Sequence, residues 1–580
     1  MEKYYTDERN IQIVLALLKA HNIRKVVASP GTTNMTLVAS MQQDSFFEMY
    51  SSVDERSAAY IACGLAAESG EPVALSCTGA TASRNYMSGL TEAYYRKLPI
   101  LAITSTQDIS KIGHHIAQVI DRRVLPNDIA KLSVDIPMIK DEDDVWDCEI
   151  KVNKVLLELK HHGGGPVHIN LATAYSRNYT VRELPQPRVI NRICMGDEFP
   201  PLPIGKIGVF VGSHGKWSKQ EAEVLDRFCA VYDAVVLCDH TSNYKGKYRM
   251  LHSLVTGQQQ LDTDLTNLEL LIHIGEVSGN CYLGKLNGKN VWRVGESGEV
   301  CDTFRKLRYV FEMSEKTFFE HYTVNDKSIS DNCWQSWQSL YSEIYESIPE
   351  LPFSNVWTAF KMAHRIPDNS IIHFGIYNSL RSWDFFELPH SVLSSSNVGG
   401  FGIDGGVSSL IGASLSDKNK LYFGVFGDLA FFYDMNVLGN RHVGNNLRIL
   451  LINNGKGTEF RQYFHPGAAF GEGADQFIAA GGHYGNKSKV LVKHYAEDLG
   501  FEYLSASDKQ EFEQVYERFL TAEITPKPIL FEVFTDNEDE SEAVESIRNI
   551  EKNVKGRARK IASQMLGNKT KESLKKMFGK

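Results

Sequence analysis

One pattern recurs along most of the chain: short runs of β-branched and other apolar residues alternate with longer segments of helical periodicity. The runs cover residues 25–29, 73–77, 99–104 and 166–171, then 207–211, 234–238 and 270–274, and finally 370–374, 421–426, 448–452 and 529–533. Strands that alternate with helices of this length form βαβ units on a parallel sheet. The sequence therefore predicts an α/β fold of three doubly wound parallel-sheet domains in series.

The length of the chain agrees with several domains. It has 580 residues, which is more than one hydrophobic core accommodates. Of these residues 43% are hydrophobic and 23% are charged, so the chain can bury large cores. Prolines at positions 185, 187, 200, 201 and 203 mark a linker after the first domain. We expect a first domain at residues 1–185, a central domain at 186–345, a third domain at 346–538 and a tail at 539–580.

Cysteine usage and charge exclude several classes of protein. The nine cysteines are scattered without a Cys-x-x-Cys pair, so they suggest neither a disulfide framework nor a zinc site. The sequence shows no signal-peptide pattern and no run of about 18 apolar residues, so we expect a cytoplasmic protein. The formal charge of −9 argues against a nucleic-acid partner.

The C-terminal tail departs from this average. From Ser546 onward it carries eleven Lys or Arg residues against two acids, and apolar residues recur near helical spacing. This pattern predicts a basic amphipathic helix. The helix is either solvated, packed on a neighbouring subunit, or in peripheral contact with an anionic membrane.

Glu55 follows a short run of alternating apolar residues and opens a segment rich in alanine and glycine. A carboxylate at a strand end, against such small residues, can be kept partly out of water and used to protonate or polarise a cofactor ring. The alternative is structural, with Asp54 and Glu55 forming an acid pair that a helix N-terminus favours.

Two later strand ends carry oxygen-bearing side chains. Asp428 follows one predicted strand, and Asn454 follows the next, 26 residues later. Because parallel strands end at the same edge of a sheet, both side chains can meet there, and the helix after Asp428 would point its amides at a phosphate. Together with the backbone carbonyl of Lys456 they form an oxygen set suited to Mg²⁺ bound to a diphosphate. Helix capping is the alternative role for both residues.

These features together resemble the thiamin-diphosphate-dependent enzymes of the acetolactate synthase and pyruvate decarboxylase superfamily. The diphosphate-binding signature of that family is Gly-Asp-Gly followed by Asn-Asn at this separation, and here Leu429 stands in place of the last glycine. Within the family the chain is most similar to the menaquinone-pathway synthases. The matching stretches are residues 29–31, 54–59, 166–170, 378–380, 402–405 and 427–429.

The resemblance implies thiamin diphosphate and Mg²⁺ as cofactors and assigns roles to residues. Glu55 would hydrogen-bond the aminopyrimidine ring and so promote loss of the thiazolium C2 proton. Ile403 would wedge the cofactor into a bent shape, although an ordinary core isoleucine is the alternative. The cofactor-binding residues implied are Pro30, Glu55, Asn85, Asn378, Ser379, Gly402, Ile403, Gly427, Asp428, Leu429, Ala430, Asn454, Lys456, Gly457 and Thr458.

The resemblance also bears on partners. Family members join the pyrimidine-binding domain of one chain to the diphosphate-binding domain of another, which implies a homodimer or a dimer of dimers with active sites at the subunit interface. Some relatives bind FAD in the central domain. We expect no FAD here, because the short glycine motif at residues 211–215 is a weak signal.

Substrate selectivity is expected to differ from that of the menaquinone-pathway synthases, which hold two carboxylate-rich substrates with arginines. The positions aligned with those arginines are here Thr33, Gln107, Trp383 and Val398. With Thr32, Glu459 and Phe460 they form the predicted substrate pocket. Such a pocket favours a hydroxylated acceptor, for example a keto-sugar. It does not favour 2-oxoglutarate and isochorismate as the substrates.

Residues 112–121 resemble a loop of acetolactate synthase that reaches the active centre. They supply His114, His115 and Gln118, which with Glu55 are the candidate catalytic residues, since imidazole titrates near working pH. An exposed surface position is the alternative for the two histidines.

The leading hypothesis is a carboligase that decarboxylates a small 2-oxo acid, such as pyruvate, and transfers the acyl unit to a second carbonyl. The alternatives are a 2-oxo-acid decarboxylase that releases an aldehyde, a true menaquinone-pathway synthase, and a catalytically silent binding protein. The presence of Glu55, Asp428 and Asn454 together argues against the silent protein.

Overall fold

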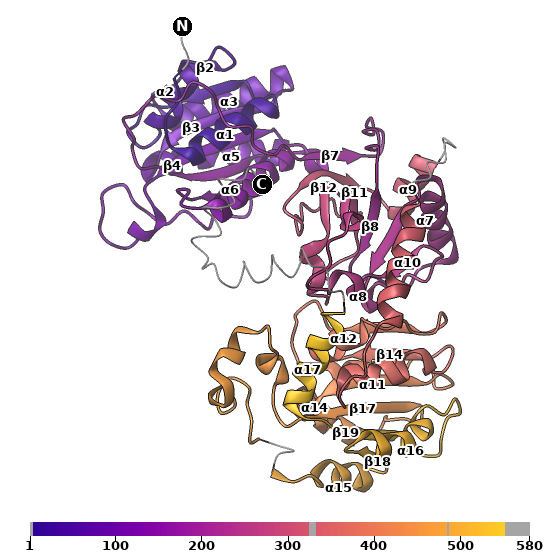
Figure 1. The fold of residues 1–580 in the computed structure, drawn as a ribbon. Helices are drawn as coiled ribbons and strands as arrows, with labels where there is room; N and C mark the ends of the chain where they lie inside the picture. Colours follow the sequence, from indigo (N-terminus) through magenta and orange to yellow (C-terminus); the bar gives the residue numbers. More distant parts are fainter. Residues whose placement is uncertain (1–3, 324–331, 484–486, 551–580) are drawn as a thin grey trace. The chain divides into compact units, whose positions relative to one another are not determined.

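The computed structural model describes residues 4–323, 332–483 and 487–550 (Figure 1). It separates into two compact units, Met1–Phe199 with Ser297–Glu312 and Pro200–Glu296 with Met313–Lys580. Three sheets, of six, seven and six strands, form the framework, and neighbouring strands in them run parallel. This confirms the predicted α/β class with three parallel sheets.

The first unit contains a six-stranded sheet with the order β2-β1-β3-β4-β6-β5. Its strands are β1 (Lys25–Ala28), β2 (Glu48–Ser51), β3 (Val73–Thr78), β4 (Ile100–Thr106), β5 (Ser133–Ile136) and β6 (Val167–Ala172). Its helices include α1 (Arg9–Ala20), α2 (Met35–Gln42), α3 (Glu55–Ser69), α4 (Thr81–Asn85), α5 (Met87–Arg96) and α6 (Glu142–Glu158). The same unit holds β7 (Asn191–Cys194) and β13 (Leu307–Glu312), which pair in parallel.

Helices cover both faces of this first sheet. Side chains alternate across a strand, so neighbouring residues of β1 enter different apolar clusters. Val26 packs with residues of α1 and α6, and Val27 packs with residues of α3 and α5. The sheet is therefore doubly wound, as its sequence pattern predicts.

The second unit contains the other helices and strands. The strands of its first sheet run in the order β10-β9-β8-β11-β12, and those of the last sheet in the order β15-β14-β16-β17-β19-β18. The strands are β8 (Ile207–Val211), β9 (Val235–Cys238), β10 (Arg249–Leu251), β11 (Asn267–Ile274), β12 (Asn287–Val294), β14 (Ile371–Phe374), β15 (Leu393–Ser396), β16 (Tyr422–Gly427), β17 (Leu447–Asn453), β18 (Glu502–Ala506) and β19 (Ile529–Phe534). The helices include α7 (Lys219–Tyr232), α8 (Ser253–Thr256), α9 (Glu315–Thr323), α10 (Cys333–Glu346), α11 (Asn355–Met362), α12 (Asn378–Trp383), α13 (Gly406–Ser414), α14 (Asp428–Asp434), α15 (Leu491–Asp498), α16 (Lys509–Phe519) and α17 (Asn537–Ile547).

All eleven strands predicted from apolar runs are present, and the run before Glu55 forms β2. The strands that the pattern did not predict are β5, β7, β10, β12, β13, β15 and β18. Five of these lie at sheet edges, where one side of the strand has no neighbour. Edge strands are partly exposed and carry polar residues, so they lack the continuous apolar run that identifies a buried parallel strand.

The residues on either side of the predicted boundary at 538 belong to one helix. The boundary after residue 538 falls inside α17, in which Asp536 caps the helix by accepting a hydrogen bond from the Glu538 amide at 2.7 Å. The acids that follow suit a helix N-terminus, and Val544 and Ile547 are buried. The acidic cluster thus starts a packed helix of the second unit. The basic helix predicted beyond it lies, from residue 551, outside the described residues.

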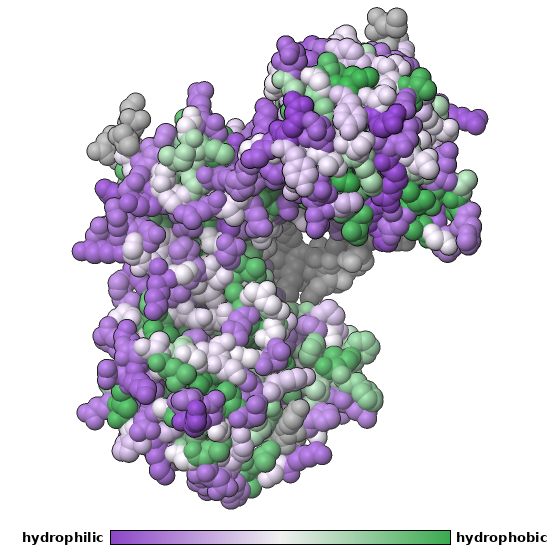
Figure 2. Space-filling model, turned by 180° about the vertical axis from the view of Figure 1, so that it is seen from behind, coloured by the Kyte–Doolittle hydropathy of each residue, from purple (hydrophilic) through white to green (hydrophobic). Residues whose placement is uncertain are grey.

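The surface in view in Figure 2 interleaves hydrophilic and hydrophobic side chains. Among the residues described, no helix combines the length and the apolar character that crossing a bilayer requires.

We predict that His168 makes the first unit sensitive to acid. This histidine on β6 is fully enclosed, with Nε2 2.7 Å from Thr104 Oγ1 and Nδ1 2.8 Å from Ser133 Oγ. Burial, helped by Arg122 and Arg84, lowers the pKa of His168 from 6.5 to about 3. Below pH 6.5 the unfolded chain therefore binds a proton that the folded chain does not, and stability falls by up to about 1.4 kcal/mol per pH unit until pH 3 is approached.

Hydrogen exchange of β4 and β6 at several pH values measures this effect. His168→Gln is expected to flatten the loss of stability between pH 6.5 and 4, and His494→Gln, at an exposed histidine, to leave it unchanged. A His168→Gln variant that is offset by the same amount at every pH would contradict the prediction.

Candidate active site

The carboxyl edge of the last sheet brings the predicted strand-end residues together. Strand β15 lies on one side of β14, and β16 and β17 follow on the other, so this edge contains the switch point at which open α/β sheets bind ligands. A cavity of about 320 Å³ opens there. Its lining includes Asn378, Ser379, Ile403, Gly427, Asp428, Leu429, Ala430, Asn454, Lys456, Gly457, Thr458, Glu459 and Phe460.

Asp428 begins α14 directly after β16, and its side chain is buried. Its Oδ2 accepts a hydrogen bond from the Gly455 amide at 2.6 Å, and its Oδ1 accepts one from the Leu429 amide at 2.7 Å. Burial raises the pKa of Asp428 to about 7, although these amides oppose the shift. A carboxylate in this position is stabilised in its charged form by a cation.

Asn454 supplies a second oxygen at the end of β17. Its Oδ1 is buried and accepts no hydrogen bond from the described part of the chain, while its Nδ2 donates to Thr458 Oγ1 at 3.3 Å. The Lys456 carbonyl accepts a hydrogen bond from the Thr458 amide at 3.0 Å and has a second lone pair. A carboxylate, an unpaired amide oxygen and a backbone carbonyl fit a hard divalent cation.

The helix after Asp428 differs from the expectation. It covers only seven residues, and the amide of Leu429, its second residue, already donates to Asp428 itself. The Gly457 amide is also engaged, since it donates to the Ala479 carbonyl at 2.6 Å. Binding of a phosphate at this edge would therefore depend on side chains and a cation more than on these two amides.

Glu459 is held by neighbours on the wall of the cavity. Its Oε1 lies 2.6 Å from Arg381 Nη1, and the two side chains are 18% and 15% exposed. With its amide group turned to satisfy both atoms, Asn378 donates to Glu459 Oε2 at 2.6 Å and accepts from the Glu459 amide at 3.0 Å. Glu459 is thus a paired carboxylate that still faces the cavity.

Three residues predicted to contact the substrate or the cofactor do not line this cavity. Trp383 is fully buried, with its ring 5.5 Å from that of Phe374, so it belongs to the core. Val398 is buried as well. Gly402 is exposed, and a Cβ there would collide with the side chain of Asp404. Neither Trp383 nor Val398 lines this cavity, because both side chains are packed against protein.

In the first unit, the residues predicted to lie near the cofactor or substrate are either hydrogen-bonded to protein groups or exposed. Thr33 Oγ1 contacts Thr78 Oγ1 and donates to the Ser105 carbonyl at 2.9 Å, so it links the ends of β3 and β4. Gln107 Oε1 accepts from Lys111 Nζ at 2.6 Å. Pro30 and Thr32 are exposed.

Glu55 and its neighbour Asp54 have separate tasks. Asp54 is the residue that caps α3, because its Oδ1 accepts from the Ser57 amide at 2.9 Å. Glu55 is half-buried, and its Oε2 accepts from Asn85 Nδ2 at 3.1 Å. The capping alternative therefore applies to Asp54 and leaves the Glu55 carboxylate beside Asn85, another residue predicted to bind the cofactor.

His114, His115 and Gln118 lie on a loop after β4, and all three are exposed. His115 and Gln118 have positive φ values of 55° and 63°. The described chain leaves these side chains at a surface.

The sequence pattern missed Glu540, which also lines the cavity. This residue of α17 is buried, and its Oε1 accepts from the Asn355 amide at 3.0 Å and from Thr535 Oγ1 at 2.7 Å. Burial raises the pKa of Glu540 to about 7. It stands in an acidic cluster that reads as the start of a tail, so only the tertiary fold identifies it.

Comparison with known proteins agrees with this geometry. Residues 10–124 match the family model of the thiamine pyrophosphate enzyme, N-terminal TPP binding domain. The 2-succinyl-5-enolpyruvyl-6-hydroxy-3-cyclohexene-1-carboxylate synthase of Bacteroides fragilis is 30% identical, over 92% of this chain and 97% of that protein. Proteins of the same name from Phocaeicola vulgatus and Porphyromonas gingivalis are 31% and 26% identical, over 93% and 92% of this chain and 97% and 96% of theirs. The chain belongs to the thiamine pyrophosphate enzyme family.

This membership confirms the resemblance drawn from the motifs and supports thiamin diphosphate, the same compound as thiamine pyrophosphate, as the cofactor. As a thiamine pyrophosphate enzyme, the chain carries Glu55 and Asn85 within the matched region. Asp428 and Asn454 lie in the part covered by the full-length relatives.

We predict that Arg381 and Glu459 are energetically coupled. In a double-mutant cycle, Arg381→Met and Glu459→Gln should show a coupling of about 1–3 kcal/mol in the free energy of unfolding by urea, because each charge is largely shielded from water. The exposed pair Lys219–Glu223, 90% and 60% exposed, is the control and should give less than about 0.5 kcal/mol. Equal couplings for the two pairs would show that Glu459 is free to serve a ligand.

Proposed function

We propose that this protein is a thiamin-diphosphate-dependent carboligase. It decarboxylates a small, pyruvate-like 2-oxo acid and transfers the acyl unit to a second carbonyl, on a hydroxylated or sugar-type acceptor. The proposal rests on Asp428 and the unpaired Asn454 Oδ1, which line one cavity at the carboxyl edge of the last sheet, in a chain of this family that also retains Glu55 beside Asn85.

In this proposal Asp428, Asn454 and the Lys456 carbonyl hold Mg²⁺ and, through it, the diphosphate. Glu55 holds a proton at the pyrimidine ring, and Asn85 orients the Glu55 carboxylate. The cofactor supplies the carbanion chemistry, and the protein supplies orientation and exclusion of water. Ile403, which lines the cavity, would fix the bend of the cofactor.

The charges around the cavity support an acceptor with few carboxylates. Arg381 is paired with Glu459, and Lys456 Nζ lies 2.7 Å from Asp475 Oδ2. Neither cation is therefore free for a substrate carboxylate. The paired Glu459 and the Thr458 hydroxyl offer hydrogen-bond acceptors and donors that suit a hydroxylated molecule.

A menaquinone-pathway synthase is the second candidate, favoured by the names of the full-length relatives. The pairing of Arg381 with Glu459 and of Lys456 with Asp475 argues against it, because substrates of that pathway are rich in carboxylates. A decarboxylase that releases an aldehyde differs from the leading proposal only in the last step. There the acyl unit is protonated instead of being transferred to a second carbonyl.

We further propose a homodimer or dimer of dimers, in which the first unit of one chain completes the site of another. The support is the surface around Glu55: Val53, Tyr60 and Ile61 are 79%, 48% and 44% exposed although they are large and apolar. A cytoplasmic location and a tail in peripheral contact with a membrane stay predictions.

Product analysis tests the reaction. With thiamin diphosphate, Mg²⁺ and pyruvate, mass spectrometry should detect a new C–C-bonded product only when an aldehyde or a nucleotide-linked keto-sugar is added. Aldehyde release regardless of acceptor would identify a decarboxylase, and turnover only with 2-oxoglutarate and isochorismate would identify a menaquinone-pathway synthase. Exclusive use of apolar acceptors would also contradict the proposal.

Glu55→Gln should lower turnover at least about 100-fold, because the amide cannot exchange the proton that the carboxylate does. Binding of thiamin diphosphate, measured by calorimetry, should change little. Glu68→Gln, at an exposed acid of the same helix, is the matched control and should keep wild-type turnover. Wild-type turnover in Glu55→Gln would refute the assigned role.

Asp428→Asn should raise the Mg²⁺ concentration needed for half-maximal cofactor binding by at least about tenfold, an effect that even outer contacts of metal sites reach. Asp498→Asn, at an exposed position, is the control. An unchanged Mg²⁺ requirement in Asp428→Asn would place the cation elsewhere.

A further inference from the structure

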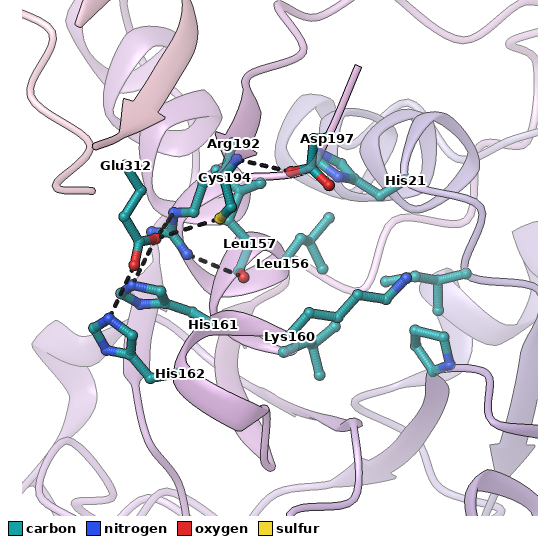
Figure 3. A pocket seen from close by; sticks show the side chains of 13 residues that line it. His21, Leu156, Leu157, Lys160, His161, His162, Arg192, Cys194, Asp197 and Glu312 are labelled. Atoms are coloured by element: carbon teal, nitrogen blue, oxygen red, sulfur yellow. Dashed lines mark hydrogen bonds and ion pairs between the residues drawn. The ribbon is translucent and has the colours of Figure 1, made fainter. Parts of the chain in front are cut away.

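A second cavity, of about 370 Å³, lies within the first unit, away from Glu55 in sequence (Figure 3). One end is formed by His161 and His162, which follow α6, and by Glu312 at the end of β13. Figure 3 shows the two imidazoles directed at the same carboxylate, which comes from a segment 150 residues later. None of these residues takes part in the proposed carboligase site.

The three side chains converge on one point. His162 Nε2 lies 2.9 Å from Glu312 Oε1, and His161 Nε2 lies 3.1 Å from Glu312 Oε2. The two rings are stacked with centroids 3.7 Å apart. One nitrogen of each imidazole and a carboxylate oxygen all lie within 4.8 Å of one another.

These separations match donors that share one ion. Zinc binds imidazole nitrogen and carboxylate oxygen at about 2.0–2.1 Å in a tetrahedral arrangement, which puts neighbouring donor atoms about 3.3 Å apart. The two nitrogen–oxygen distances at Glu312, 2.9 and 3.1 Å, are only slightly shorter than this.

The hydrogen bonding of His161 favours a cation between its ring and Glu312. His161 Nδ1 lies 2.9 Å from Glu158 Oε2, so it carries the proton that this carboxylate accepts. In the neutral ring the buried Nε2 then presents a lone pair to Glu312 Oε2, so their 3.1 Å contact is not a hydrogen bond. Two acceptors at that distance require either a second proton or a metal ion, and a carboxylate behind a histidine is the usual support of a metal ligand.

The backbone is arranged at some cost to place both rings. His162 has φ 46° and ψ 52°, a left-handed conformation that is unfavourable for histidine. Gly163, Gly164 and Gly165 follow with positive φ, and a Cβ on Gly164 would lie 2.8 Å from the Leu159 carbonyl. The glycines thus allow the tight loop that stacks consecutive histidines on one carboxylate.

Local charge selects the class of ion. Arg192 Nε lies 3.6 Å from Glu312 Oε2, and the guanidinium is fixed by the Leu157 and Gly298 carbonyls at 3.4 and 3.0 Å. A nearby cation disfavours Mg²⁺ or Ca²⁺, which depend on several anionic oxygens. Two imidazoles favour a borderline transition-metal ion instead.

We propose that His161, His162 and Glu312 bind one Zn²⁺ ion that fastens the loop after α6 to β13. The fourth position is left to water, because the His162 side chain is 67% exposed and gives access to solvent. The ion ties the segment Ser297–Glu312 to the rest of the first unit and so stabilises that unit.

Zinc titration of the full-length protein tests this proposal. Metal-free protein is equilibrated with Zn²⁺, bound metal is counted by mass spectrometry after gel filtration, and Co²⁺ is used as a spectroscopic substitute. Wild-type protein should bind one Zn²⁺ per chain and unfold at a higher temperature with Zn²⁺ than without it. His162→Gln, which alters an exposed side chain, and Glu312→Gln should each bind Zn²⁺ at least about tenfold more weakly.

The controls separate this site from the others. His494→Gln, at an exposed histidine of the second unit, and Asp428→Asn, at the proposed Mg²⁺ site, should bind Zn²⁺ like the wild type. Zinc binding that is equally strong in His162→Gln and Glu312→Gln would overturn the proposal, as would a wild-type protein that retains no stoichiometric Zn²⁺. Because Asp428→Asn impairs only the cofactor site, either proposal can fail without the other.

Discussion

The geometry of the second unit depends on the parallel register of β16 and β17. Gly427 pairs with Ile452, so the residues that follow the two strands emerge side by side, and the Gly455 amide reaches Asp428 Oδ2 at 2.6 Å. The same closeness buries the carboxylate and raises the pKa of Asp428 to about 7. The sheet thus creates a carboxylate that is unstable alone and well suited to a bound cation.

The first unit repeats this topology with a different result. The six-stranded sheet of each unit places its second strand on one side of its first strand and all later strands on the other. In the first unit the switch point is closed by hydroxyl groups, since Thr33 joins Thr78 and the Ser105 carbonyl. Glu55 is set apart at the start of α3, beside Asn85. The same topology therefore places Glu55 at the start of α3 in the first unit and the buried Asp428 at the start of α14 in the second.

The sequence predicted what local patterns encode. Buried strands are continuous apolar runs, and the strand-end acid and amide are visible as spacing, so β16, β17 and their polar ends could be placed in advance. Pairings between side chains of distant segments could not be predicted from the sequence. Glu459 bonds to Arg381 and Trp383 turns into the core because of tertiary packing, and Glu540 enters the cavity from a helix that its composition marks as a tail.

The two proposed ion sites differ in the donors that the fold gathers, and this difference keeps the ions apart. Asp428 and Asn454 offer oxygen only, on a rigid strand edge, which suits a small hard ion bound to phosphate. His161 and His162 offer nitrogen beside a single carboxylate whose charge is already offset by Arg192. An ion that depends on oxygen anions would bind weakly there, whereas an ion that bonds strongly to imidazole would bind well. In both proposals the choice of ion follows from ligand chemistry rather than from the size of either cavity.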